Sequence, residues 1–118
     1  MFLRKLFSGI FLFLLLFSTS FAFDVPPYED YVTDLANIIP AEQEKTIENK
    51  ITQIETDTTV EISILTIPTT GDTDIFEATL NTAETWGVGK ASNDNGLILL
   101  IAVEDRNWFM ATGYGLEG

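Results

Sequence analysis

The spacing of apolar residues predicts that the chain begins its fold with a helix and a strand. Ile47, Ile51 and Ile54 recur at helical spacing and predict a helix over residues 40–56, with its other side facing water. Residues 59–67, TVEISILTI, are rich in β-branched side chains and predict a strand. The strand first alternates and then becomes apolar on both faces, a pattern typical of a buried parallel strand.

A second helix is predicted after the polar loop 68–74. Asp74 suits the N-cap position, and Gly87 suits the residue that ends the helix. The expected apolar stripe of this helix consists of Phe76, Leu80 and Ala83, with Trp86 close to it.

Two more strands close the pattern. Residues 97–103, LILLIAV, form a continuous apolar run, which predicts a central strand covered on both faces. A tight turn at 104–107 then leads into an antiparallel strand over 108–112. Upstream, a short apolar patch is expected to lie across the core; it consists of Val32, Leu35, Ile38 and Ile39.

The order helix, strand, helix, strand, strand predicts an α/β fold with a mixed sheet. The two predicted strands on either side of the second helix should be parallel and joined by a right-handed crossover. Two helices are too few to cover both faces of the central strand, so we expect the fold to be incomplete.

The N-terminus has the features of a secretory signal peptide. Arg4 and Lys5 precede an apolar run over residues 6–17, and small residues at Ser20 and Ala22 predict cleavage after Ala22. A retained membrane anchor is the alternative, but the run is shorter than the roughly 20 residues that span a bilayer. We therefore expect residues 1–22 to be a signal peptide and the mature protein to be exported.

Charge and composition limit the chemistry. The chain carries 18 acidic residues against six basic ones, a net charge of −12, which disfavours nucleic acid and anionic lipid as partners. This balance suits cations, calcium above all, although solubility alone would also explain it. The chain has no cysteine and no histidine, so disulfides and the commonest general base are excluded.

The segment 113–118, GYGLEG, matches the glycine pattern of a dinucleotide-binding loop, but its context does not. The preceding strand is the return arm of a hairpin, and no residues follow to form the required helix. Glu117 would also oppose a pyrophosphate. We therefore expect no nucleotide and attribute these glycines to the backbone.

Acidic residues are expected at both ends of the sheet. Asp72, Asp74, Glu104 and Asp105 follow strands and would meet at the carboxyl edge, where open α/β sheets bind ligands. The opposite edge would gather Asp94, Asn95 and the segment 113–118. The 91–96 loop lacks the carboxylates of an EF-hand. Topology alone does not choose between the two edges.

Residues 86–118, with their W-G-x-G, D-N-G, D-R and G-Y-G-L-E-G elements in one order, resemble the TPM domain family. Residues 32–36 resemble the V-x-D-x-A opening of that family. The resemblance implies a TPM domain over residues 23–118, folded as a three-layer α/β/α sandwich outside the cytoplasm. It also implies further C-terminal helices that are missing here, and often a membrane anchor.

The resemblance implies two functions. The first is a calcium-binding accessory or assembly module of a membrane-associated protein complex, and the alternative is a metal-assisted acid phosphatase; a folded spacer is a third option. The expected phosphate-binding residue is Arg106. The expected metal ligands are Asp34, Asp94, Asn95, Glu104 and Asp105.

Overall fold

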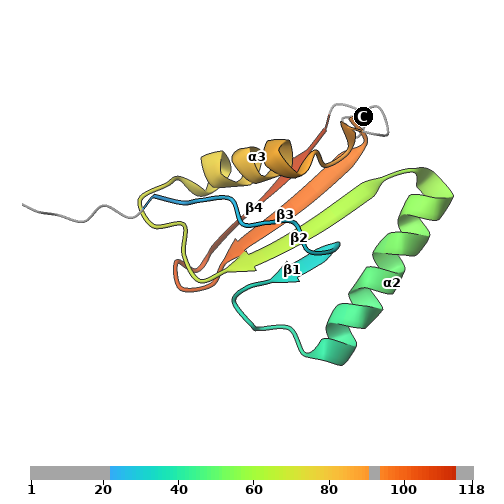
Figure 1. Ribbon diagram of the computed structural model, residues 1–118, viewed down its shortest axis with the longest axis horizontal. Helices are drawn as coiled ribbons and strands as arrows, with labels where there is room; N and C mark the ends of the chain where they lie inside the picture. Colours follow the sequence, from blue (N-terminus) through green and yellow to red (C-terminus); the bar gives the residue numbers. More distant parts are fainter. Residues whose placement is uncertain (1–21, 91–93, 114–118) are drawn as a thin grey trace, which may run out of the picture.

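The computed structural model describes residues 22–90 and 94–113, which form a four-stranded sheet and two helices (Figure 1). In chain order the elements are β1 (Val32–Asp34), α2 (Ala41–Thr58), β2 (Glu61–Ile67), α3 (Ile75–Trp86), β3 (Gly96–Ala102) and β4 (Asn107–Thr112). The strand order is β1-β2-β3-β4, with β1, β2 and β3 parallel and β4 antiparallel to β3. The predicted α/β class with a mixed sheet and a central β3 is confirmed.

Helix α2 occupies the predicted region with small differences. Pro40 is the N-cap residue rather than part of the first turn, and it supplies no side-chain cap. The helix ends where Thr59 adopts a left-handed conformation, with φ of 67°. On the expected apolar stripe Ile51 is buried, but Ile54 is 39% exposed. The described helices include none that is long and apolar enough to cross a membrane.

Helix α3 confirms both predicted caps but not the expected stripe. The Asp74 side chain accepts hydrogen bonds from the N–H groups of Phe76 and Glu77, and Gly87 ends the helix with φ of 66°. Phe76 and Leu80, predicted on the apolar stripe, are 50% and 42% exposed. The buried side of the helix carries smaller residues instead: Ala78, Thr79 and Thr82. Small side chains let the helix lie close to the sheet.

Helix α3 packs over β3 and β4 on one face of the sheet, which we call the helical face, whereas α2 packs against β1 and β2 (Figure 1). The main core joins Ala78 of α3 to β2 and β3. The chain before β1 packs against this core through Phe23, and the Trp86 Nε1–H donates a hydrogen bond of 2.8 Å to the carbonyl oxygen of Pro26. The strand residues of this core are Leu65, Ile67, Leu100 and Ala102.

The other face of the sheet, which we call the open face, has no helix over β3 and β4 among the described residues. Burial alternates along β3: its even-numbered residues are buried, whereas Leu97, Leu99 and Ile101 are only half-buried. Trp108 on β4 is 62% exposed. Among the described residues, β3 is therefore covered fully on one face only.

The apolar patch that precedes α2 was predicted wrongly as core. Val32 is buried in β1, but Leu35 is 43% exposed and Ile38 is 48% exposed. Of this patch, only the residue in β1 belongs to the sheet, because the strand ends at Asp34 and the chain turns away from the sheet there. This turn brings the Asp34 side chain to the end of the strand.

Candidate functional site

Asp34 stands at the carboxyl edge of the sheet and holds the turn that leads to α2. Its carboxylate accepts hydrogen bonds from the Thr66 hydroxyl at 2.5 Å, the Ile38 N–H at 3.2 Å and the Ile39 N–H at 2.9 Å. Burial acts to raise the pKa of Asp34, but these hydrogen bonds and one from Asn37 outweigh it and lower the pKa. Both carboxylate oxygens are therefore committed to the local backbone and to β2.

Asp105 has the same kind of task in the turn between β3 and β4. It accepts hydrogen bonds from the Thr70 N–H at 2.9 Å, the Thr69 hydroxyl at 2.8 Å and the Thr70 hydroxyl at 3.3 Å. The bond from the Thr70 N–H is the main cause of a lowered Asp105 pKa. Glu104 and Arg106 are exposed beside it, and Arg106 adopts φ of 50° in the turn. Asp105 thus ties this turn to the loop after β2.

Asp94 and Asn95 lie at the opposite, amino edge. The Asn95 side chain donates a hydrogen bond to the Thr59 hydroxyl at 3.1 Å, and the Asn95 backbone carbonyl oxygen accepts one from the Glu61 N–H at 3.0 Å. Asp94 has φ of 59°, and a Cβ added to Gly113 would stand 2.0 Å from the Asp94 carbonyl oxygen. Both residues therefore lie where the loop before β3 contacts the start of β2 and the end of β4.

Two glycines of the motif pack backbone against backbone at this edge. A Cβ on Gly89 would approach the Gly96 nitrogen to 2.4 Å, and one on Gly96 would approach the Gly89 nitrogen to 2.7 Å. This close contact places the Gly89 N–H so that it donates a hydrogen bond of 2.5 Å to the Glu61 carboxylate. Sequence reasoning missed Glu61, although a charged residue opening a largely apolar strand was a usable signal.

The five predicted metal ligands do not form one site. Asp34, Glu104 and Asp105 lie at the carboxyl edge and Asp94 and Asn95 at the amino edge, about 20 Å apart along the seven residues of β2. Within residues 22–90 and 94–113, no group of three or more His, Cys, Asp or Glu side chains is placed to hold a metal ion. The segment 114–118 and residues 91–93 lie outside the described residues.

The order and placement of these motif residues agree with a comparison against protein-family models. The model described as the TPM domain matches residues 32–118. The chain belongs to the TPM domain family. The TPM signature therefore spans everything from β1 onward, and the described part of it divides between the two edges of the sheet.

Solved structures support the same assignment. The N-terminal domain of a protein from P. gingivalis, solved by solution NMR, is 38% identical with a TM-score of 0.69, covering 75% of this chain and 56% of that one. The N-terminal domain of a Corynebacterium glutamicum protein shares the fold at 20% identity with a TM-score of 0.63, covering 82% and 64%. The chain thus spans less than two thirds of the length of either structure. Among the curated proteins, none matches it.

We predict that Asp105→Asn lowers the thermal unfolding midpoint at neutral pH, because the amide cannot accept from Thr69 and Thr70 as the carboxylate does. The folded-state pKa of Asp105 lies below its unfolded value, which is about 3.9. Its contribution is therefore complete above that value and is lost as the pH falls through the folded one. The gap between wild type and variant should narrow as the pH is lowered from about 5 toward about 3.

Glu104→Gln is the matched control, because it removes the same charge one residue away and leaves the Thr69 and Thr70 contacts in place. Its midpoint should stay near that of the wild type. Equal losses in the two variants, or a gap that does not change with pH, would contradict the role assigned to Asp105.

Proposed function

We propose that this TPM domain is an exported accessory module that binds components of a membrane-associated protein complex, and that it is not an enzyme. One observation carries the proposal: Trp86, Gly89, Asn95, Gly96 and Asp105 of the TPM signature make contacts that hold the fold together. These side chains hold loops in place, and these glycines allow close contacts between backbone segments, so both have structural roles. A domain of this kind acts through the surfaces it presents.

Each part of the signature illustrates this use. Trp86 anchors the chain before β1, and Asn95 joins the β3 entry to the end of α2. Gly89 and Gly96 permit a close backbone contact, and Asp105 ties two loops together. These contacts stabilise this domain whatever it binds.

Export and membrane association rest on the sequence. The predicted signal peptide at residues 1–22 supports export, and it lies outside the described residues apart from Ala22. The net charge of −12 favours partners with basic surfaces over nucleic acid. A protein partner in the cell envelope satisfies both conditions.

The proposed function does not include calcium, because the predicted ligands do not lie together at one site. Asp34 and Asp105 already accept hydrogen bonds on both oxygens, and the remaining ligands are divided between the two edges. A calcium ion is coordinated by six to eight oxygen ligands. The phosphatase alternative depends on the same metal and has only Arg106 for its phosphate.

The test compares assembly with catalysis in the complete protein. We expect detergent-solubilised envelopes of producing cells to contain the protein in an assembly larger than its own mass. We also expect the purified protein, with calcium or with chelator, to hydrolyse p-nitrophenyl phosphate no faster than its Asp105→Asn variant, measured where both are folded.

The two readouts separate the candidates. Turnover that depends on calcium and disappears in folded Asp105→Asn would establish the phosphatase and reject the proposal. A protein that migrates at its own mass in every envelope extract would also reject it, and would favour the folded spacer.

A further inference from the structure

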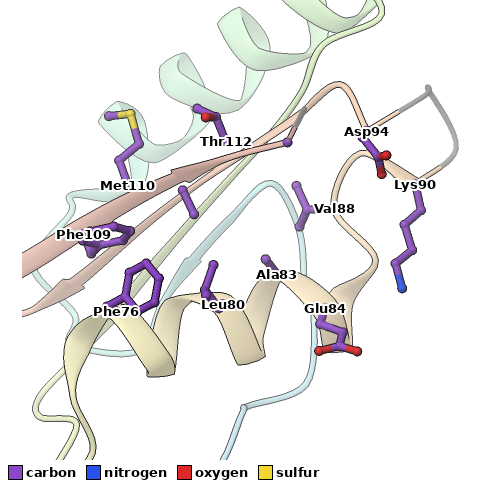
Figure 2. A pocket seen from close by; sticks show the side chains of 12 residues that line it. Phe76, Leu80, Ala83, Glu84, Val88, Lys90, Asp94, Phe109, Met110 and Thr112 are labelled. Carbon is purple, nitrogen blue, oxygen red and sulfur yellow. The ribbon is translucent and has the colours of Figure 1, made fainter. Parts of the chain in front are cut away.

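A groove runs between α3 and β4 on the helical face (Figure 2). Its volume is about 780 Å³. Phe76 and Leu80 line the helix side, and Phe109 and Ala111 line the strand side. The rings of Phe76 and Phe109 meet edge to face with centroids 5.1 Å apart, which fixes one end of the groove floor. The groove is the surface onto which the mispredicted stripe of α3 points.

The outer edge of β4 lies beside this groove and carries backbone groups without a strand partner among the described residues. The Gly113 N–H donates to the Gly96 carbonyl oxygen at 2.8 Å, which fixes the alternation of the β3–β4 ladder. The odd-numbered residues of β4 therefore bond to β3, and the even-numbered ones point outward. The Asn107 side chain accepts the Trp108 N–H at 3.0 Å, which leaves Met110 and Thr112 to offer outward N–H groups.

The opposite edge of the sheet is treated differently. At β1, the Glu48 carboxylate of α2 lies beside the Val32 N–H and so covers part of that edge. Folded proteins generally cover, charge or shorten an edge strand, because an open one pairs with other chains. β4 has six residues, and two of its outward-pointing residues, Trp108 and Met110, are large and apolar.

Both flanks of the β4 edge are apolar. Phe76 and Leu80 are exposed on the helical face, and Trp108 and Met110 are 62% and 44% exposed on the open face. These four are half of the large exposed apolar side chains among the described residues. A strand added beside β4 would place alternate side chains against one pair and then the other. An occupant of this edge must therefore be apolar on both faces.

We propose that β4 binds an extended segment of a partner protein as a fifth strand, with alternate side chains of that segment filling the α3–β4 groove. This inference rests on the proposed binding function and names its recognition mode, which is strand addition. Backbone groups of Met110 and Thr112 supply the hydrogen bonds, and Phe76 and Leu80 select apolar side chains.

Charge decides what kind of segment binds. Glu84 and Asp94 stand with Lys90 at one end of the groove, so acids outnumber bases there, as they do in the whole chain (Figure 2). Two copies of this chain paired through β4 would bring two strongly negative surfaces together. A segment from another protein, apolar within and flanked by Lys or Arg, is complementary in charge.

The test selects random displayed peptides against the complete protein. We expect the selected peptides to be rich in β-branched or aromatic residues with basic flanks. Met110→Pro removes an outward N–H that the sheet does not use, and proline is tolerated at such edge positions. Binding of the selected peptides should weaken about tenfold or more in this variant, while the thermal midpoint changes little.

Leu80→Lys is the second variant and keeps the backbone intact. It places a positive charge in the exposed groove and should weaken binding of the basic peptides by a similar factor. As a control, Thr52→Lys adds the same charge on the exposed side of α2 and should leave binding unchanged. N-methylation of the peptide at alternate residues should abolish binding in one register and not in the other.

Each other outcome overturns the inference. These outcomes are selection of no peptide, peptides that bind both β4 variants as well as wild type, or a homodimer in sedimentation equilibrium that Met110→Pro dissolves. If the native assembly persists in Met110→Pro, the edge is not the docking site although the accessory function stands. If the peptides bind as expected but no native assembly exists, the proposed function fails while the edge retains its binding activity.

Discussion

Gly89→Ala is expected to destabilise the protein by about 3 kcal/mol or more, a large fraction of the 5–15 kcal/mol typical of a domain. The added Cβ would lie 2.4 Å from the Gly96 nitrogen and 2.6 Å from its Cα, so two stretches of backbone must separate. That separation would also break the hydrogen bond from the Gly89 N–H to Glu61. Alanine at φ of 79° adds backbone strain.

Gly87→Ala is the matched control two residues away. Gly87 has a similar φ of 66°, but its added Cβ meets nothing nearer than the Lys90 Cδ at 4.0 Å. Gly87→Ala therefore introduces the backbone strain without a steric overlap, and it should lower the free energy of unfolding by about 1 kcal/mol. Unfolding by urea at equilibrium measures both. Equal losses would mean that the Gly89–Gly96 contact is loose enough to absorb a methyl group.

The secondary structure was predictable because its signals are local. Asp74 caps a helix whose first N–H groups are its near neighbours in sequence, and Gly87 ends it in the backbone conformation that glycine favours. The parallel pairing of β2 with β3 follows from the helix between them. In each case the interacting groups belong to the same element as the residue that gives the signal, or to a neighbouring element in sequence.

The orientation of α3 was not predictable from its apolar residues. A stripe of Phe76, Leu80 and Ala83 indicates an apolar face but not what it contacts. The sheet accepts Ala78, Thr79 and Thr82 instead, since threonine can satisfy its hydroxyl within the helix, as Thr79 does with the Ile75 carbonyl oxygen at 2.7 Å. Large apolar side chains left outside the core are what a binding surface requires.

The roles of the acidic residues depended on contacts between distant parts of the chain. Asp105 bonds to Thr70 across 35 positions in sequence, and Glu61 bonds to Gly89 across 28. Only the register of the sheet brings these partners together. The sequence indicated correctly that Asp105 lies at the carboxyl edge, but it could not show that its oxygens are already engaged by Thr69 and Thr70.

The uneven cover of the sheet gives the second large effect, expected for Leu100→Ala. Leu100 is fully buried on the helical face with Leu65 and Ala78, so its truncation leaves a cavity and should cost about 2–5 kcal/mol. The preceding residue on the same strand points to the open face. Leu99→Ala removes the same atoms from a half-buried position and should cost about 1 kcal/mol.

The pair of leucine variants therefore measures how far the second face of β3 is covered. Continuous apolar sequence along this strand predicts cover on both faces, whereas the described residues cover β3 fully on the helical face alone. Urea unfolding of the two variants decides between these possibilities, because only a packed side chain leaves a costly cavity. A Leu99→Ala loss as large as that of Leu100→Ala would contradict our expectation. It would mean that a third layer packs on Leu97, Leu99 and Ile101 in the protein, as the TPM resemblance implies.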